Sequence, residues 1–144
     1  MRFEKSIDID APQQLVWDVL TDLEAWPRRI DTVEAVELVT PPPVSQGSRV
    51  RLKQPKLPEG VWDVTVWDAP SYFAWTQKTG GIISVAGHRV AALGDACARL
   101  TLTLDMRGFL VPVVALFYKD LTNRYMALEA DGMKRASEAA QATP

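Results

Sequence analysis

The segment Ile7–Asp22 (IDIDAPQQLVWDVLTD) contains the change of period that decides the fold. Before Asp10, apolar and polar residues alternate from Phe3 onward, which is the pattern of a β-strand with one buried face. After Asp10, apolar residues recur every three or four positions, as on one face of a helix. Asp10 is a good N-cap, and Pro12 suits a first turn because it lacks the amide hydrogen that this turn leaves unbonded. The segment therefore predicts a strand followed by a helix that ends near Asp22.

Further along the chain, alternating runs separated by turn residues predict more strands. A second short helix or irregular turn is expected over 23–30. The expected strands are 3–10, 33–39, 49–54, 61–67, 71–77, 82–93 and 98–107. Short turns at 68–70 and 94–95 join the later strands, which predicts an antiparallel sheet.

The C-terminal stretch from Pro112 to about Ala140 has no internal proline or turn cluster. Its apolar residues recur at spacings of three, four or seven, which predicts one long amphipathic helix of roughly 40 Å. Together the elements predict an α+β fold in a single domain covering 1–144. In this fold the first strand precedes two short N-terminal helices, the remaining strands complete a curved antiparallel sheet of about six to seven strands, and the long helix crosses its concave face.

Composition excludes several classes of protein. The 144 residues include one cysteine and one histidine, which excludes an internal disulfide, a cysteine-cluster metal site and any site that needs two histidines. A net charge of −2 argues against a general nucleic-acid binder. No apolar run is long enough to span a bilayer, and the N-terminus lacks the apolar core of a signal peptide. We therefore expect a cytoplasmic protein.

The order of motifs resembles one superfamily along nearly the whole chain. The residues that carry the resemblance are Ile7–Pro12, Val16-Trp17, Leu20–Asp22, Trp26-Pro27, Gly47, His88, Gly94 and Gly132–Lys134. They are similar to the polyketide cyclase/dehydrase and StAR-related lipid-transfer superfamily, also called SRPBCC or helix-grip. The resemblance implies a deep apolar cavity between the sheet and the C-terminal helix, filled by a hydrophobic or amphipathic small molecule. Arg28-Arg29 departs from the aromatic residue that this family often carries there, so ligand identity does not transfer.

Within that frame, Trp17 is interpreted as a core residue, Asp22 as a cap at the break between the helices, and Trp26 as part of the cavity rim. Alternation places Trp67 on the wet face of its strand, opposite Val66. The residues expected to line the cavity are Trp75, Phe73, Gln54, Leu102, Leu104, Met106, Phe117 and Leu121.

Candidate chemical groups are few. His88 is the one side chain whose ordinary pKa lies near neutrality, but its strand pattern leaves its face ambiguous. On the long helix, Asp120 and Arg124 are four residues apart and can pair, and Tyr125 lies beside them. An enzyme that enolises or dehydrates a poly-β-ketone needs such acid and base groups inside its pocket. His88, Asp120, Arg124 and Tyr125 are therefore the candidate catalytic set.

Three functions remain open at this stage. The favoured one is binding of a lipid, quinone, polyketide or aromatic metabolite, because ionisable residues are scarce on the inward faces. The second is a cyclase, aromatase or dehydratase, which requires at least two titratable groups converging in the pocket. The third is an interaction module with a packed interior. We expect no cofactor, no metal, no nucleic-acid partner and no stable membrane insertion, and a monomer or homodimer.

Overall fold

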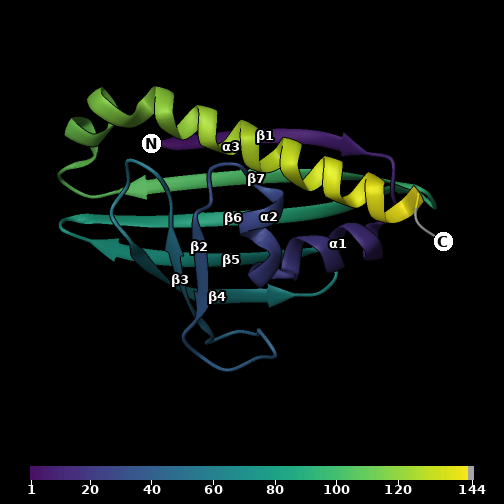
Figure 1. Cartoon of the computed structure of the whole chain (residues 1–144). Coiled ribbons are helices and arrows are strands. Elements are labelled where there is room, and N and C mark those ends of the chain that lie inside the picture. Colours follow the sequence, from purple (N-terminus) through teal and green to yellow (C-terminus); the bar gives the residue numbers. More distant parts are fainter. Residues whose placement is uncertain (143–144) are drawn as a thin grey trace.

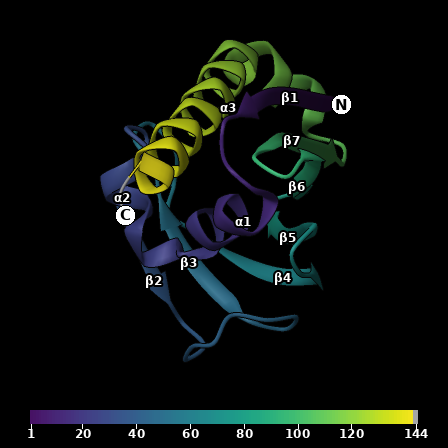
Figure 2. The same cartoon turned by 90° about the vertical axis from the view of Figure 1, so that its right-hand side faces the viewer.

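One antiparallel sheet of seven strands, in the order β1-β7-β6-β5-β4-β3-β2, is the framework of the computed structural model, which describes residues 1–142 (Figure 1). The elements are β1 (Arg2–Ile9), α1 (Gln13–Thr21), the 3-10 helix η1 (Leu23–Ala25), α2 (Trp26–Arg29), β2 (Ala35–Leu38), β3 (Arg49–Lys53), β4 (Gly60–Asp68), β5 (Tyr72–Thr79), β6 (Ile82–Gly94), β7 (Cys97–Arg107) and α3 (Val111–Ala142). Figure 2 shows the sheet curving around α1, with α3 across its open side. The predicted α+β architecture is confirmed.

Rows of paired residues build the inner face of β5, β6 and β7. In the central row Phe73, His88 and Leu102 lie side by side and are buried. The next two rows, toward the end where β7 leads into α3, are Trp75–Ala86–Leu104 and Gln77–Ser84–Met106. In these rows Ala86, Leu104, Gln77 and Met106 are only half-buried. The inner face is therefore closed at its centre and opens toward the N-terminal half of α3.

An irregularity between Val64 and Val66 interrupts the alternation of β4. Val64 is buried, Val66 is exposed, and Trp67 packs inward with ring centroids 5.3 Å from Trp17 and 5.5 Å from Phe73. The expectation that Trp67 lies on the wet face is wrong, because one inserted residue moves those that follow to the opposite face. Trp17 is buried in the core as predicted.

Neither of the two predicted side-chain caps forms. The chain turns immediately after β1, so Pro12 rather than Asp10 occupies the N-cap position of α1. The backbone N–H of Asp10 instead donates to the Glu138 carboxylate, 2.9 Å away, which ties this turn to α3. Asp22 makes no cap hydrogen bond, and its carboxylate lies 3.5 Å from the Arg29 guanidinium. Ion pairing thus replaces capping where the short helices meet.

The C-terminal part of α3 packs against β1, α1 and α2. At its closest approach to α2, a Cβ built on Gly132 would lie 2.2 Å from the carbonyl oxygen of Arg29. Only glycine allows the two backbones to come so near. None of the helices within residues 1–142 is both long and apolar enough to cross a lipid bilayer.

Candidate functional site

His88 is held on the inner face of β6 by its neighbour on β5. Its ring stacks on Phe73, with centroids 4.1 Å apart and planes 7° from parallel, and the residue is 2% exposed. The Nδ1–H donates a long hydrogen bond, 3.4 Å, to the Phe73 carbonyl oxygen, which can only accept. In the neutral ring the lone pair therefore belongs to Nε2.

Aromatic side chains surround this histidine. The ring of Trp75 meets it edge-on at 5.3 Å between centroids, and the ring of Trp26 lies 6.1 Å away. Trp62 extends the cluster from β4, 5.9 Å from Trp75. Trp26 is fully buried and donates its indole N–H to the Leu20 carbonyl at 2.8 Å, so it is a core residue rather than part of a rim. The histidine therefore lies in a rigid, largely apolar environment.

Glu129 brings a second titratable group to the same place from α3. Its Oε1 lies 3.9 Å from His88 Nε2, and its side chain is 19% exposed. Burial raises the pKa of Glu129 to about 7. Burial also lowers the pKa of His88 to about 4, and the hydrogen bond to Phe73 opposes this only in part. Just below neutral pH both groups are therefore uncharged, so they form a neutral pair rather than an ion pair.

The facing atoms of this pair have no hydrogen-bond partner in the described part of the chain. The 3.9 Å gap between Oε1 and Nε2 is too long for a hydrogen bond. The buried His88 and the half-buried Glu129 thus face each other with unused hydrogen-bonding capacity.

The other predicted site residues are buried, half-buried or exposed. Phe73, Trp75 and Leu102 are buried in the core. The half-buried ones are Leu104, Met106, Gln54 and Leu121. Tyr125 reaches from α3 to the loop after β3, where its hydroxyl donates to the Pro55 carbonyl oxygen. Tyr125 is therefore a link across the open side of the sheet.

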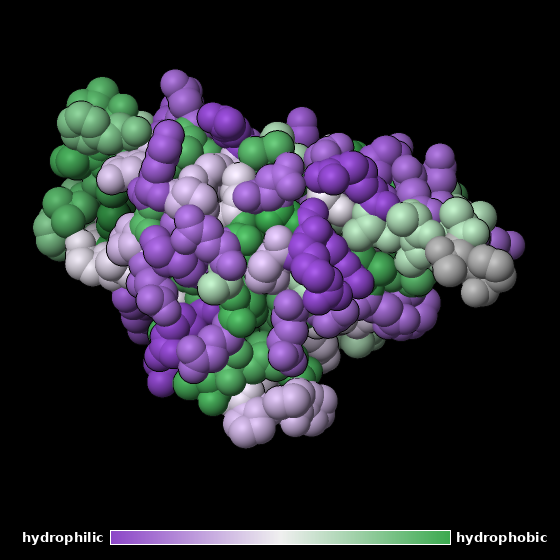
Figure 3. Space-filling view, in the orientation of Figure 1, coloured by the Kyte–Doolittle hydropathy of each residue, from purple (hydrophilic) through white to green (hydrophobic). Residues whose placement is uncertain are grey.

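The expected positions of Asp120, Arg124 and Phe117 on the inner side of α3 are wrong. All three are exposed, Phe117 at 72%, and no ion pair joins Asp120 to Arg124 in residues 1–142. The buried face of α3 instead contains Ala130 and Met133, so the opposite side of the helix points away from the sheet. Apolar residues on that outer side join Phe109 in an exposed apolar patch, seen as green at one end of the molecule in Figure 3.

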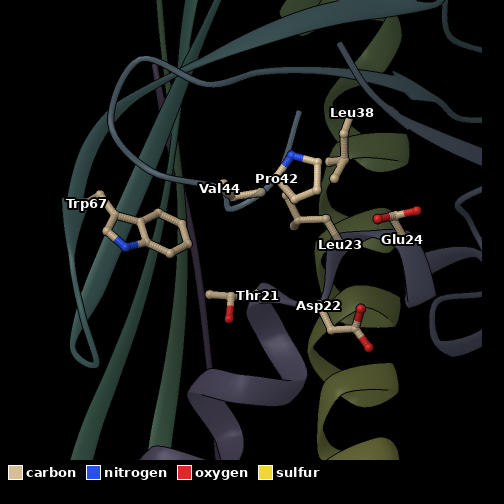
Figure 4. Close-up of a pocket in the computed structure, with 8 residues that line it drawn as sticks. All are labelled: Thr21, Asp22, Leu23, Glu24, Leu38, Pro42, Val44 and Trp67. Atoms are coloured by element: carbon tan, nitrogen blue, oxygen red, sulfur yellow. The ribbon is translucent and has the colours of Figure 1, made fainter. Parts of the chain in front are cut away.

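A separate shallow pocket lies at the junction of α1 and η1 (Figure 4). It has a volume of about 260 Å³ and is lined by Thr21, Asp22, Leu23, Glu24, Leu38, Pro42, Val44 and Trp67. None of the residues predicted for the site lines it. Its polar lining comes from helix-end residues, and neither His88 nor Glu129 contributes to it.

Glu129 is the functional candidate that sequence reasoning missed. It lies three residues after Met126 and four before Met133, which is the spacing of the buried helical stripe. A carboxylate within such a stripe is a signal, because charged residues are almost never fully buried unless paired. The strand alternation, by contrast, could not decide the face of His88, which pairing with Phe73 and Leu102 now fixes.

Comparisons with known proteins agree with this architecture. The family model described as polyketide cyclase / dehydrase and lipid transport matches residues 1–138. The Zhui aromatase/cyclase from Streptomyces sp. R1128 has a TM-score of 0.81 and 18% identity, with 99% of this chain and 96% of that chain covered. A norcoclaurine synthase mutant from Thalictrum flavum, in complex with a transition-state analogue, has a TM-score of 0.79 and 13% identity, covering 99% and 96%.

A START superfamily protein from Mycobacterium smegmatis has a TM-score of 0.71 and 16% identity, covering 94% of this chain and 97% of that chain. No curated protein has a significantly similar sequence. At these identities the structural likenesses show a common fold.

Proposed function

Because the chain belongs to the polyketide cyclase/dehydrase and lipid transport family, we propose that it binds a hydrophobic or amphipathic small molecule between the sheet and α3. The observation that carries this proposal is the partly exposed inner face beside the unpartnered His88–Glu129 pair. A lipid, quinone, polyketide or aromatic metabolite has the required chemistry.

Physical support comes from the inner rows that remain half-buried. Ala86, Leu104 and Met106 present apolar surface on the same side of the sheet as the core. Each Å² of such surface covered by a ligand contributes about 25 cal/mol to binding. Tyr125 bridges α3 and the loop at Pro55, so the open side has a defined border. A ligand with a large apolar body and few polar groups fits these surroundings.

Native mass spectrometry of freshly purified protein tests the proposal directly. A discrete adduct of a few hundred daltons, recovered by denaturing extraction, is the expected result and identifies the chemical class of the ligand. If purified apo protein also binds none of a panel of fatty acids, quinones and polycyclic aromatics, the proposal is wrong.

A second candidate function, cyclase- or dehydratase-type catalysis, is favoured by one specific observation. Glu129 holds a carboxyl group with a pKa of about 7 next to the inner face, so it can both accept and return a proton near neutral pH. In an enolisation its carboxylate would take a proton from the carbon between two carbonyl groups, leaving an enolate. The resulting carboxylic acid would return a proton to carbon or oxygen.

Deuterium exchange separates this function from simple binding. With a hydrophobic β-ketoester in D2O, an enzyme incorporates deuterium at the acidic carbon faster than the uncatalysed reaction, and Glu129→Gln removes the acceleration. Asp120→Asn is the matched control, because it changes an exposed carboxylate on the same helix. If the protein binds the ketoester without accelerating deuterium incorporation, the catalytic function is wrong and only the binding function remains.

A further inference from the structure

Two polar groups with unused hydrogen-bonding capacity face each other where an aromatic cluster surrounds His88. We infer that His88 and Glu129 together bind a single hydroxyl oxygen, so that the ligand is a neutral phenol. This inference rests on the proposed binding function and specifies the polar part of the ligand.

The separation of the pair suits one shared oxygen atom. His88 Nε2 and Glu129 Oε1 are 3.9 Å apart. At this separation one oxygen atom can lie about 2.8 Å from each of them, a normal hydrogen-bond distance. The position is also built rather than accidental, because the His88 side chain is only 3% exposed and is fixed by stacking on Phe73.

The donor and acceptor pattern selects a hydroxyl group. Since Nδ1–H of His88 is used by the Phe73 carbonyl, Nε2 offers a lone pair and accepts. A protonated Glu129 carboxyl offers an O–H and donates. A hydroxyl group satisfies both, because it donates to Nε2 while accepting from Glu129. An ether oxygen or a carbonyl oxygen satisfies Glu129 alone and leaves Nε2 without a donor.

The surroundings of the pair favour an aromatic alcohol over an aliphatic one. Trp75 meets the histidine ring edge-on, with planes 85° apart, and lies in the same row as the half-buried Ala86, while Trp62 packs against Trp75. The centroids of these rings lie 5–6 Å apart, with one ring edge-on or tilted to the next, and aromatic rings attract one another in this geometry. A flat ring bearing the hydroxyl can join this cluster, which supports a phenol.

The test compares 2-naphthol with 2-methoxynaphthalene, which has the same ring system but cannot donate a hydrogen bond. Binding is measured by calorimetry at about pH 6, where Glu129 is protonated and His88 neutral. The ether lacks only the hydrogen bond to Nε2 and leaves that buried acceptor without a partner, so 2-naphthol should bind about fivefold or more tightly. Glu129→Leu should weaken the binding of both compounds, because each accepts the hydrogen bond from Glu129, whereas His88→Phe, which removes the Nε2 acceptor, should reduce the preference for 2-naphthol to within about threefold.

A second measurement needs no variant. His88 is the sole histidine of the chain, so ¹⁵N labelling of histidine gives signals from one ring. Its Nε2 resonance should move upfield on binding 2-naphthol and not on binding the ether. Equal affinities with an unmoved Nε2 signal would overturn this inference and leave the proposed function standing. If neither compound binds, this inference is overturned, and the panel of fatty acids, quinones and polycyclic aromatics decides the proposed function separately.

Discussion

Replacing Glu129 by glutamine should change how the stability of the protein depends on pH. Burial raises the pKa of Glu129 from 4.5 to about 7. The folded protein therefore retains a proton that the unfolded chain releases, and stability is lost as the pH rises from 4.5 to about 7. At about 1.4 kcal/mol per pH unit this amounts to about 3 kcal/mol. The partial exposure of the side chain makes that figure an upper limit.

Urea unfolding of wild type and Glu129→Gln at several pH values measures this effect. Near pH 4 the two proteins should have the same free energy of unfolding, because the acid is then protonated in both the folded and the unfolded chain and glutamine imitates it. At about pH 8 the variant should be more stable by up to about 3 kcal/mol. His88 has the opposite dependence, since its pKa of about 4 removes stability as the pH falls below 6.5. The His88 contribution is common to both proteins, so it cancels in the difference between their free energies of unfolding. If plots of that free energy against pH are parallel for the two proteins, Glu129 is not buried in its uncharged form.

Two substitutions and one titration test the packing around the site. Gly132→Ala should lower the free energy of unfolding in urea by about 1–3 kcal/mol, because the new Cβ would lie 2.2 Å from the Arg29 carbonyl oxygen. This clash outweighs the ~1 kcal/mol gain in helix propensity. Asp131→Ala, at an exposed position in the same turn, is the control, and its free energy of unfolding should stay within about 0.5 kcal/mol of the wild type. Trp26→Phe should cost about 1–3 kcal/mol in thermal unfolding, since it removes a buried indole hydrogen bond, and an unchanged midpoint would contradict its structural role. In NMR, the His88 ring should titrate near pH 4, and a midpoint near 6.5 would show that it is open to solvent.

The sequence predicted correctly which side chains are buried wherever the alternation of apolar and polar residues runs uninterrupted through a strand. In β7, Leu100 and Leu102 are buried as the alternation predicts, because the strand keeps a regular register with β1 and β6 around these two residues. The same logic failed in β4, where the irregularity after Val64 turned Trp67 inward. A bulge depends on the partner strand as well as on local sequence, so the alternation of one strand does not reveal it.

On α3 the sequence predicted the helix but not which side faces the sheet. Apolar residues occur around much of its N-terminal half, so Phe117 and Leu121 were equally plausible inner residues, and only Leu121 is half-buried. Close contact of Gly132 with α2 fixes the rotation of the helix, and this sends Asp120 outward and Glu129 inward. Such a rotation arises from long-range packing, which local periodicity does not contain.

The position of a bound ligand can be found by following the indole N–H signals of the five tryptophans and the ring signals of His88 while 2-naphthol is added. A ligand between the sheet and α3 should move the signals of His88 and Trp62 and leave that of Trp67, which lines the separate pocket of Figure 4, unchanged. Movement of the Trp67 signal with a stationary His88 ring would place the ligand in that pocket and contradict binding between the sheet and α3.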